Sequence, residues 1–164
     1  MISQSHEMQS IAKAILITIV TTAMILVFMN LAFFFPWYLT LVVETYNVSQ
    51  IVAGDNYLKN SDYEDALDRL QKRPIFRDKA DDIKITVLNE DKEDARGGDD
   101  ATDYYEMPEA DKPYRQRGKS LQVEIKAVYP FSITLWGKPV EREMPVRFSM
   151  TTTGLKHYKD LDYY

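Results

Sequence analysis

Few side chains in this sequence are suited to covalent or acid–base chemistry. The 164 residues include no cysteine, and the two histidines, His6 and His157, lie at opposite ends of the sequence. Without cysteine there is no disulfide, thiolate metal site, iron–sulfur cluster or cysteine nucleophile. A nucleophile–base pair needs a histidine or an equivalent base beside a hydroxyl or thiol, and there is no glycine-rich phosphate loop. We therefore expect no catalytic residue, no cofactor-binding residue and no enzymatic activity.

The densest group of charged side chains lies in a predicted loop, residues 89–118. Residues 90–111 hold ten acids and two bases, Lys92 and Arg96. Calcium needs carboxylates at fixed spacing with a glycine at the sharp turn, and no EF-hand register fits residues 91–103. We expect a polar loop that is solvated or contacts another subunit, without metal. A specific calcium site is the alternative.

The remaining charge is distributed very unevenly along the chain. The net charge is −5, which gives no reason to expect a nucleic-acid partner, and residues 1–43 carry only Glu7 and Lys13. The apolar run over residues 14–35 is long enough for a membrane span, which needs about 20 residues. We predict a transmembrane helix at 11–35. A cleaved signal peptide is the alternative, but its apolar core would be shorter and would end at a small-x-small site.

The apolar character continues beyond the predicted span. As a helix, residues 11–43 would be about 50 Å long, whereas a hydrocarbon core is about 30 Å thick. Pro36 is expected to kink or stop the helix, and Trp37 and Tyr38 favour the membrane–water boundary. The excess length predicts strong tilt or protein contacts outside the lipid. Lys13 favours a cytoplasmic N-terminus with the acidic remainder outside.

Small and polar residues form a pattern along this helix. Small residues four apart let two helices approach closely in lipid, and hydroxyl or amide groups can bond between them. A lone amide in lipid is costly without a partner. Coincidence is the alternative, because alanine and threonine are common in spanning helices. The residues expected at a helix–helix contact are Ser10, Ala14, Thr18, Thr22 and Asn30.

The rest of the chain reads as a water-facing domain of α+β class. The predicted organisation is a polar N-terminus (1–10), a transmembrane or filament-core helix (11–43), a helix continuation or linker (44–60) and an extracytoplasmic domain (61–164). Ser61 and Glu64 have the spacing of a capping box, which predicts a short helix at 62–72. Alternating apolar residues then predict a four-stranded, mainly antiparallel sheet. Its strands are expected at 83–87, 121–129, 131–135 and 144–151.

Aromatic side chains are abundant in the segments outside these elements. Tyrosine gives a large contact area at low entropic cost and is enriched in protein interfaces. The alternative is that some of these rings cover the edge of the core. The aromatic residues expected at a subunit interface are Trp37, Tyr38, Tyr104, Tyr105, Tyr114, Tyr158, Tyr163 and Tyr164.

In this order of elements the chain resembles the type IV pilin-like proteins, and among them the small single-span TadE-like pilins. The segments that carry the resemblance are Val43–Ala53, Leu121–Tyr129, Met144–Met150 and Thr153–Tyr158. The family is cleaved just before its apolar run, and the mature chain has a glutamate at its fifth position. Glu7 is the only acid before the helix, and in the family's N-terminal pairing role it would place cleavage between Ile2 and Ser3, a departure from the family pattern. The alternatives are that processing differs, that Met1 is near the mature start, or that the chain lies outside the family.

Two functions follow as expectations. The resemblance implies a structural subunit, stored in the cell membrane, that polymerises through its apolar helix into an extracellular filament or pilus-like secretion or conjugation assembly. Its partners would be copies of itself, membrane lipid before assembly, and other pilin-like subunits with an assembly platform. The alternative is a non-catalytic, single-span accessory subunit of a larger membrane complex. An anchored domain that binds a ligand or cell wall is a third hypothesis.

Overall fold

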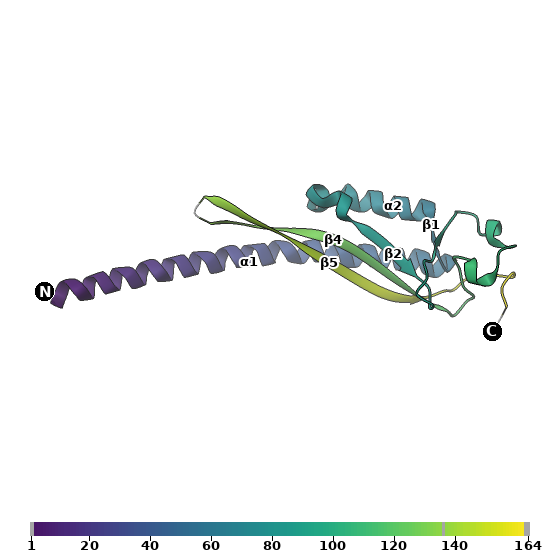
Figure 1. Cartoon of the computed structure of the whole chain (residues 1–164), viewed down its shortest axis with the longest axis horizontal. Coiled ribbons are helices and arrows are strands. Elements are labelled where there is room, and N and C mark those ends of the chain that lie inside the picture. The colour runs from purple at the N-terminus through teal and green to yellow at the C-terminus, as the bar shows by residue number, and fades with distance from the viewer. Residues whose placement is uncertain (1, 136, 163–164) are drawn as a thin grey trace. The chain divides into compact units, whose positions relative to one another are not determined.

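Figure 1 shows the computed structural model of the chain, which describes the backbone of residues 2–135 and 137–162 and the side chains of residues 8–134 and 137–162. As expected, the fold is α+β, with a long apolar N-terminal helix and a small sheet domain. The elements are α1 (Ile2–Asp55), β1 (Leu58–Lys59), α2 (Asn60–Gln71), η1 (Pro74–Asp82), β2 (Lys84–Leu88), β3 (Arg96–Gly97), η2 (Ala101–Tyr104), η3 (Glu109–Asp111), β4 (Ser120–Leu135) and β5 (Lys138–Thr153).

Helix α1 is continuous over 54 residues and passes through Pro36 without ending there. A helix of this length extends about 80 Å. The helix stops after Asp55 because Asn56 adopts a left-handed backbone conformation, with φ of 61°. Asparagine tolerates this conformation better than most residues. Its buried amide also donates to the carbonyl oxygens of Arg115 (2.8 Å) and Lys156 (2.7 Å), which fixes the turn.

Helix α2 confirms the short helix expected after residue 61, but its predicted cap is wrong. The N-cap residue is Lys59, and no side chain caps the helix from that position. Instead, the backbone N–H of Ser61 donates to Asp99 Oδ1 at 2.9 Å. A free N–H in the first turn of a helix needs an acceptor from somewhere, and here a distant loop supplies it rather than the adjacent sequence.

The expected four-stranded sheet is also wrong in detail. Five strands form a three-stranded sheet, ordered β2-β4-β5, and a parallel pair, β1 with β3. The predicted strands at 121–129 and 131–135 are one strand, β4, which continues through Pro130. β2 is antiparallel to β4, and their pairing extends only to Lys84 opposite Lys126. Pro130 lies beyond that pairing, where β4 no longer has β2 as a partner.

The acidic segment at 89–118 is more ordered than a solvated loop. It contains β3, η2 and η3, and it buries Ala95, Lys112 and Arg115. The Ala95 N–H donates to Val87 O at 2.9 Å, so the segment extends the β2 edge of the sheet. Its acidic side chains at residues 90–111 are exposed, while its backbone is held by the sheet.

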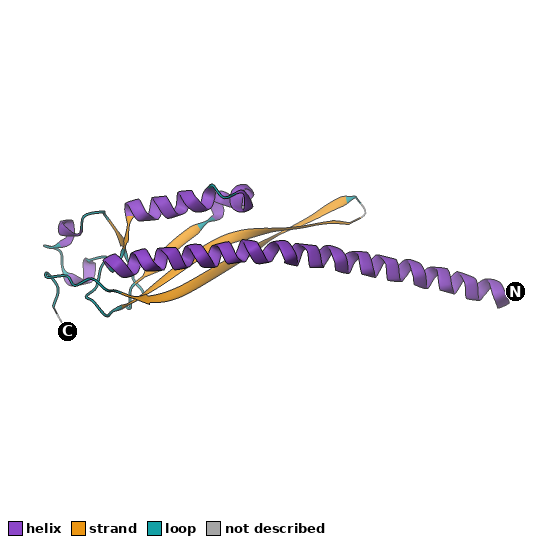
Figure 2. Cartoon of the chain, turned by 180° about the vertical axis from the view of Figure 1, so that it is seen from behind, coloured by secondary structure: helices purple, strands orange, loops and turns teal. Residues whose placement is uncertain are grey.

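The chain divides into two compact units. The larger contains Trp37–Pro130 and Glu143–Tyr164, and the smaller contains Met1–Pro36 and Phe131–Arg142. We call residues 131–142, the outer part of the β4–β5 hairpin, the arm; Figure 2 shows this hairpin in orange. In the larger unit, the second half of α1 and the inner face of the sheet share a core. Its buried residues include Leu41, Val48, Val52, Val87, Leu121, Val123, Ile125 and Ala127.

Candidate membrane and assembly surface

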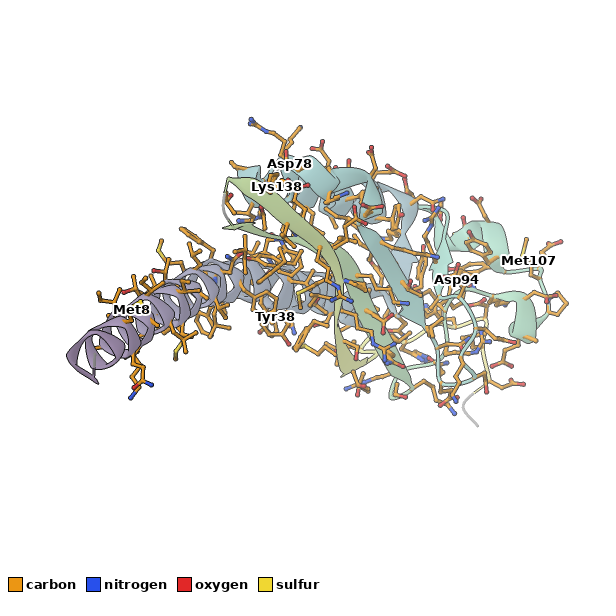
Figure 3. All side chains as sticks on the ribbon, turned by 60° about the vertical axis from the view of Figure 1, so that its left-hand side comes forward. Met8, Tyr38, Asp78, Asp94, Met107 and Lys138 are labelled. Atoms are coloured by element: carbon orange, nitrogen blue, oxygen red, sulfur yellow. The ribbon has the colours of Figure 1, made fainter. Side chains whose placement is uncertain are left out.

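The described residues contain one helix that is long and apolar enough to cross a membrane, and it begins near the N-terminus. Around Met8, side chains project on all sides of α1 in Figure 3. Large apolar residues occur at nearly every turn and on every face, so the helix is apolar all round rather than along one stripe. The exposed ones are Met8, Ile11, Ile15, Leu16, Ile17, Ile19, Val20, Met24, Ile25, Val27, Phe28, Met29, Leu31, Phe33 and Phe35. A helix of this kind is stable inside a membrane or a protein core.

The residues expected at a helix–helix contact lie in this apolar half. Ser10, Ala14, Thr18 and Thr22 are exposed, and Asn30 is half-buried. Thr18 donates its hydroxyl to Ala14 O at 2.9 Å, and Asn30 donates its amide to Leu26 O at 3.1 Å. Both polar groups therefore have a partner within the helix, so neither requires a second helix. The side chain of Glu7 lies outside the described residues.

In the second half of α1, the buried side chains lie on one face of the helix. Its buried residues recur every three or four positions, which places them on one face. They are Trp37, Leu41, Glu44, Thr45, Val48, Ser49 and Val52. Leu39, Val43 and Tyr46, which lie between them, are about half exposed. This half is an ordinary amphipathic helix packed on a domain.

The aromatic residues that follow Pro36 are part of that packing. The Trp37 side chain is 3% exposed, and its ring centroid lies 5.2 Å from those of both Phe76 and Tyr129. Tyr38 meets Phe148 of β5 edge-on at 6.1 Å. These two residues, expected at a boundary or subunit interface, therefore join α1 to η1 and to the sheet.

A buried carboxylate ties α1 to α2, and sequence reasoning missed it. Glu44 is 2% exposed and accepts a hydrogen bond from Arg73 Nη2 at 2.6 Å. Arg69 Nε lies 3.7 Å from the other carboxylate oxygen. A buried carboxylate is stable only when it is paired in this way. The available signal was one acid, Glu44, ending a long apolar run, with Arg69 in the next predicted helix and Arg73 just after it.

The predicted interface tyrosines have different positions in the structure. Tyr114 and Tyr158 are buried and stack on each other, with centroids 3.9 Å apart, while Tyr104 is half-buried beside them. Tyr105 is 48% exposed. The area of the two stacked rings is used inside the domain, and among the described tyrosines of this group the ring of Tyr105 is the most exposed. Tyr163 and Tyr164 lie outside the described residues.

Burial and one ion pair set the electrostatics of this tyrosine cluster. Asp160 accepts hydrogen bonds from Lys112 Nζ (2.6 Å) and the Tyr114 hydroxyl (2.8 Å). Burial alone would raise the pKa of Asp160, but these two donors outweigh it and hold that pKa below its ordinary value. Burial, followed by the bond to Asp160, raises the pKa of Tyr114. The cluster closes the C-terminal segment onto the acidic loop.

The acidic loop surrounds a cavity of about 450 Å³. Glu90, Asp91, Glu93 and Glu109 line it, but so do Arg115 and Lys119. Arg115 is paired with Glu93 at 2.7 Å and Lys119 with Glu90 at 2.9 Å. Among the described residues, no group of three or more histidine or acidic side chains is placed to hold a metal ion. The loop carboxylates act here as partners of cations within the same chain.

His157, the one histidine with a described side chain, contacts an amide. Its Nδ1 lies 3.0 Å from Gln116 Oε1, which also accepts the Tyr158 N–H. Gln116 in turn donates to the Tyr158 carbonyl at 2.9 Å. This arrangement holds the C-terminal segment in place.

In comparisons with known proteins, no family model matches this chain, and no curated protein or solved structure is detectably similar to it.

Proposed function

We propose that this protein is a structural, pilin-like subunit that is stored in a membrane and polymerises through the first half of α1 into a surface filament or pilus-like assembly. One observation carries the proposal. A single helix is apolar and uncovered on nearly all sides through residue 35, whereas from Trp37 it packs one face on a folded domain.

Water is a poor environment for the first half of α1. Burying one large apolar side chain contributes about 1.5–3 kcal/mol relative to leaving it exposed, and the uncovered half of α1 presents such side chains at nearly every turn. Either lipid or other helices must therefore surround it. The stretch from Met8 to Pro36 is about 40 Å long as a helix, more than the roughly 30 Å of a hydrocarbon core.

A helical bundle of copies would satisfy the same surface outside the membrane. Each copy would place its apolar helix in the centre and its domain outside, so that apolar surface stays away from water. A head-to-tail contact of this kind does not close, and the polymer grows. The small residues Ala14, Thr18 and Thr22 would allow close approach of neighbouring helices. Lys13 near the N-terminus favours a domain on the extracytoplasmic side.

The test is electron microscopy of material sheared from expressing cells, with mass spectrometry of the same fraction. Regular fibres composed mainly of this chain support the proposal, and the N-terminal peptide reports whether cleavage occurs between Ile2 and Ser3. A chain that stays in the membrane pellet and copurifies in detergent with other proteins is instead an accessory subunit of a membrane complex.

A matched pair of variants sharpens this test. Thr18→Leu widens the helix at a small residue without adding charge, so membrane insertion is retained while close helix contact is blocked. Ile17→Leu, one residue away, keeps the volume and serves as the control. We expect fibres from the control and not from Thr18→Leu; fibres of normal yield from both variants would remove Thr18 from the contact.

A further inference from the structure

The first half of α1 is not equally uncovered along its length. Residues 8–22 are exposed throughout, but beyond them half-buried side chains recur at Ala23, Leu26, Asn30 and Phe34. Spacings of three and four residues place these four side chains on one face of the helix. Something therefore lies along that face from Ala23 onward.

The arm is the segment that lies there. It is the part of the smaller unit that is not α1. Along its first strand Phe131 and Ile133 are half-buried, whereas Ser132 and Thr134 are exposed. Alternate residues of a strand point to opposite faces, so one face of this first strand is partly covered, whereas residues 138–142 of the second strand are all exposed. Because the helix and the arm are the two parts of one compact unit, these two half-buried faces are the surfaces available to cover each other.

The arm itself is unsuited to hydrocarbon. Lys138, Glu141 and Arg142 are exposed, and Figure 3 labels Lys138 at the outer end of the hairpin. Its backbone is open as well, because β2 pairs with β4 only as far as Lys126, and β5 is the last strand of the sheet in the described part of the chain. Lipid offers no partner for open strand edges, and charged side chains there are costly.

The helix, however, needs the covered segment in order to span a membrane. The apolar run begins at Ala14, just after Lys13, so residues 14–22 are its part before the covered segment, about 14 Å of helix. That is shorter than a hydrocarbon core of about 30 Å. A span must therefore include residues beyond Ala23, and these are the residues whose half-buried face lies in the same unit as the arm. A helix in lipid and an arm closed on it exclude each other.

We propose that the arm and membrane lipid compete for the same face of α1: the arm separates from the helix while the helix is in the bilayer and closes on it when the helix leaves. This inference rests on the proposed function, which requires the helix to leave the lipid. Closure covers the Ala23–Phe34 face with Phe131 and Ile133 outside the membrane. It also limits which faces of the helix remain free to contact neighbouring copies.

Pairs of cysteines in the full-length chain test the proposal, because the natural sequence has none. Two test pairs join helix to arm: Phe34→Cys with Phe131→Cys, and Asn30→Cys with Ile133→Cys. The control pair, Tyr38→Cys with Phe148→Cys, joins residues that pack together inside the larger unit. A short bis-maleimide is applied to membranes and to the sheared fibre fraction. We expect the control to cross-link in both, and the test pairs severalfold more in fibres than in membranes.

The other cross-linking results overturn the inference. If the test pairs cross-link in membranes to the same extent as the control pair, the arm is closed beside a membrane-inserted helix. Test pairs that cross-link in neither sample show that the arm does not close. A fluorophore attached at Val27→Cys checks whether the covered segment lies in the bilayer. Quenching by aqueous iodide, and not by a quencher carried in the lipid, would place this segment outside the bilayer. If no fibres form, the proposed assembly is wrong. Cross-linking in membranes then still shows whether the arm separates from the membrane-inserted helix.

Discussion

The two halves of α1 belong to one continuous helix, yet they have different surroundings. Through residue 35 nearly all large apolar side chains are exposed, whereas from Trp37 to Val52 the buried side chains form one stripe. Both halves contain many apolar residues, so total hydrophobicity does not separate them. In the second half the buried stripe itself includes polar residues, Glu44, Thr45 and Ser49, whose groups find partners there. Packing against the domain, and not the distribution of polar residues around the helix, therefore separates the half that needs lipid or other helices from the half that does not.

The largest expected effect comes from removing a core side chain of the packed half. Leu41 is fully buried and Leu39 is 50% exposed, although both lie in the same turns of α1. Leu41→Ala should lower the free energy of unfolding of the domain by about 2–5 kcal/mol, because it leaves a cavity. Leu39→Ala should change it by less than about 0.5 kcal/mol. Denaturant titration in detergent followed by near-UV circular dichroism measures both, and equal effects would contradict the one-sided packing.

The next effect concerns the ion pairs between α1 and α2. Glu44→Gln keeps the shape of the side chain but removes the charge that Arg73 and Arg69 contact. We expect a loss of roughly 1–3 kcal/mol, the usual range for a hydrogen bond to a charged group. Glu64→Gln, on the exposed side of α2, is the control and should be neutral. A neutral Glu44→Gln would mean that packing alone joins the two helices.

Acid should weaken the packed domain through carboxylates held in their charged form. The pKa values of Asp160 and Asp55 lie below normal: burial opposes ionisation, but lysine hydrogen bonds outweigh it in both. Their stabilisation is complete above the unfolded-state pKa of about 3.9 and is lost as pH falls through the lower folded-state values. Unfolding followed from about pH 6 to about pH 2 should show this loss. Asp160→Asn should flatten the curve, and an unchanged slope would exclude Asp160 from it.

The smallest expected effect lies in the uncovered half. Phe28 is 70% exposed, so Phe28→Ala should change the free energy of unfolding of the domain by no more than about 0.5 kcal/mol. The same titration in detergent measures it. A loss as large as that of Leu41→Ala would mean that the first half of α1 also contributes to the folded domain, and the comparison between the two halves would fail.

Local patterns in the sequence predicted several elements correctly. The apolar run predicted the long helix, residues 61–72 predicted α2, and alternation predicted that Leu121, Val123 and Ile125 share a buried face. These predictions succeeded because each depends on the periodicity of neighbouring side chains. The strand break expected at Pro130 and the cap expected at Ser61 failed. Each depended on which distant segment lies alongside, the end of β2 in the first case and Asp99 in the second.

For the candidate membrane and assembly surface, too, the sequence predicted some features and not others. Which residues are apolar, and that they surround the first half of α1, could be read from the sequence. That Trp37, Tyr114 and Tyr158 are buried could not, because an aromatic ring suits a core and an interface equally well. Glu44 was missed for a related reason, since Arg69 lies in α2 and Arg73 just after it, and their proximity to Glu44 depends on how α1 packs against this part of the chain.

The sequence by itself determined that this chain has an apolar helix long enough for a membrane, a charged α+β domain, and no cysteine chemistry, because composition and periodicity are local properties. Only the tertiary structure decided where the helix changes from uncovered to packed, how two stacked tyrosines and a buried ion pair close the domain, and that an arm of the β4–β5 hairpin belongs with the apolar half of α1. Those features join residues far apart in the chain, and burial and pairing in three dimensions set their energies.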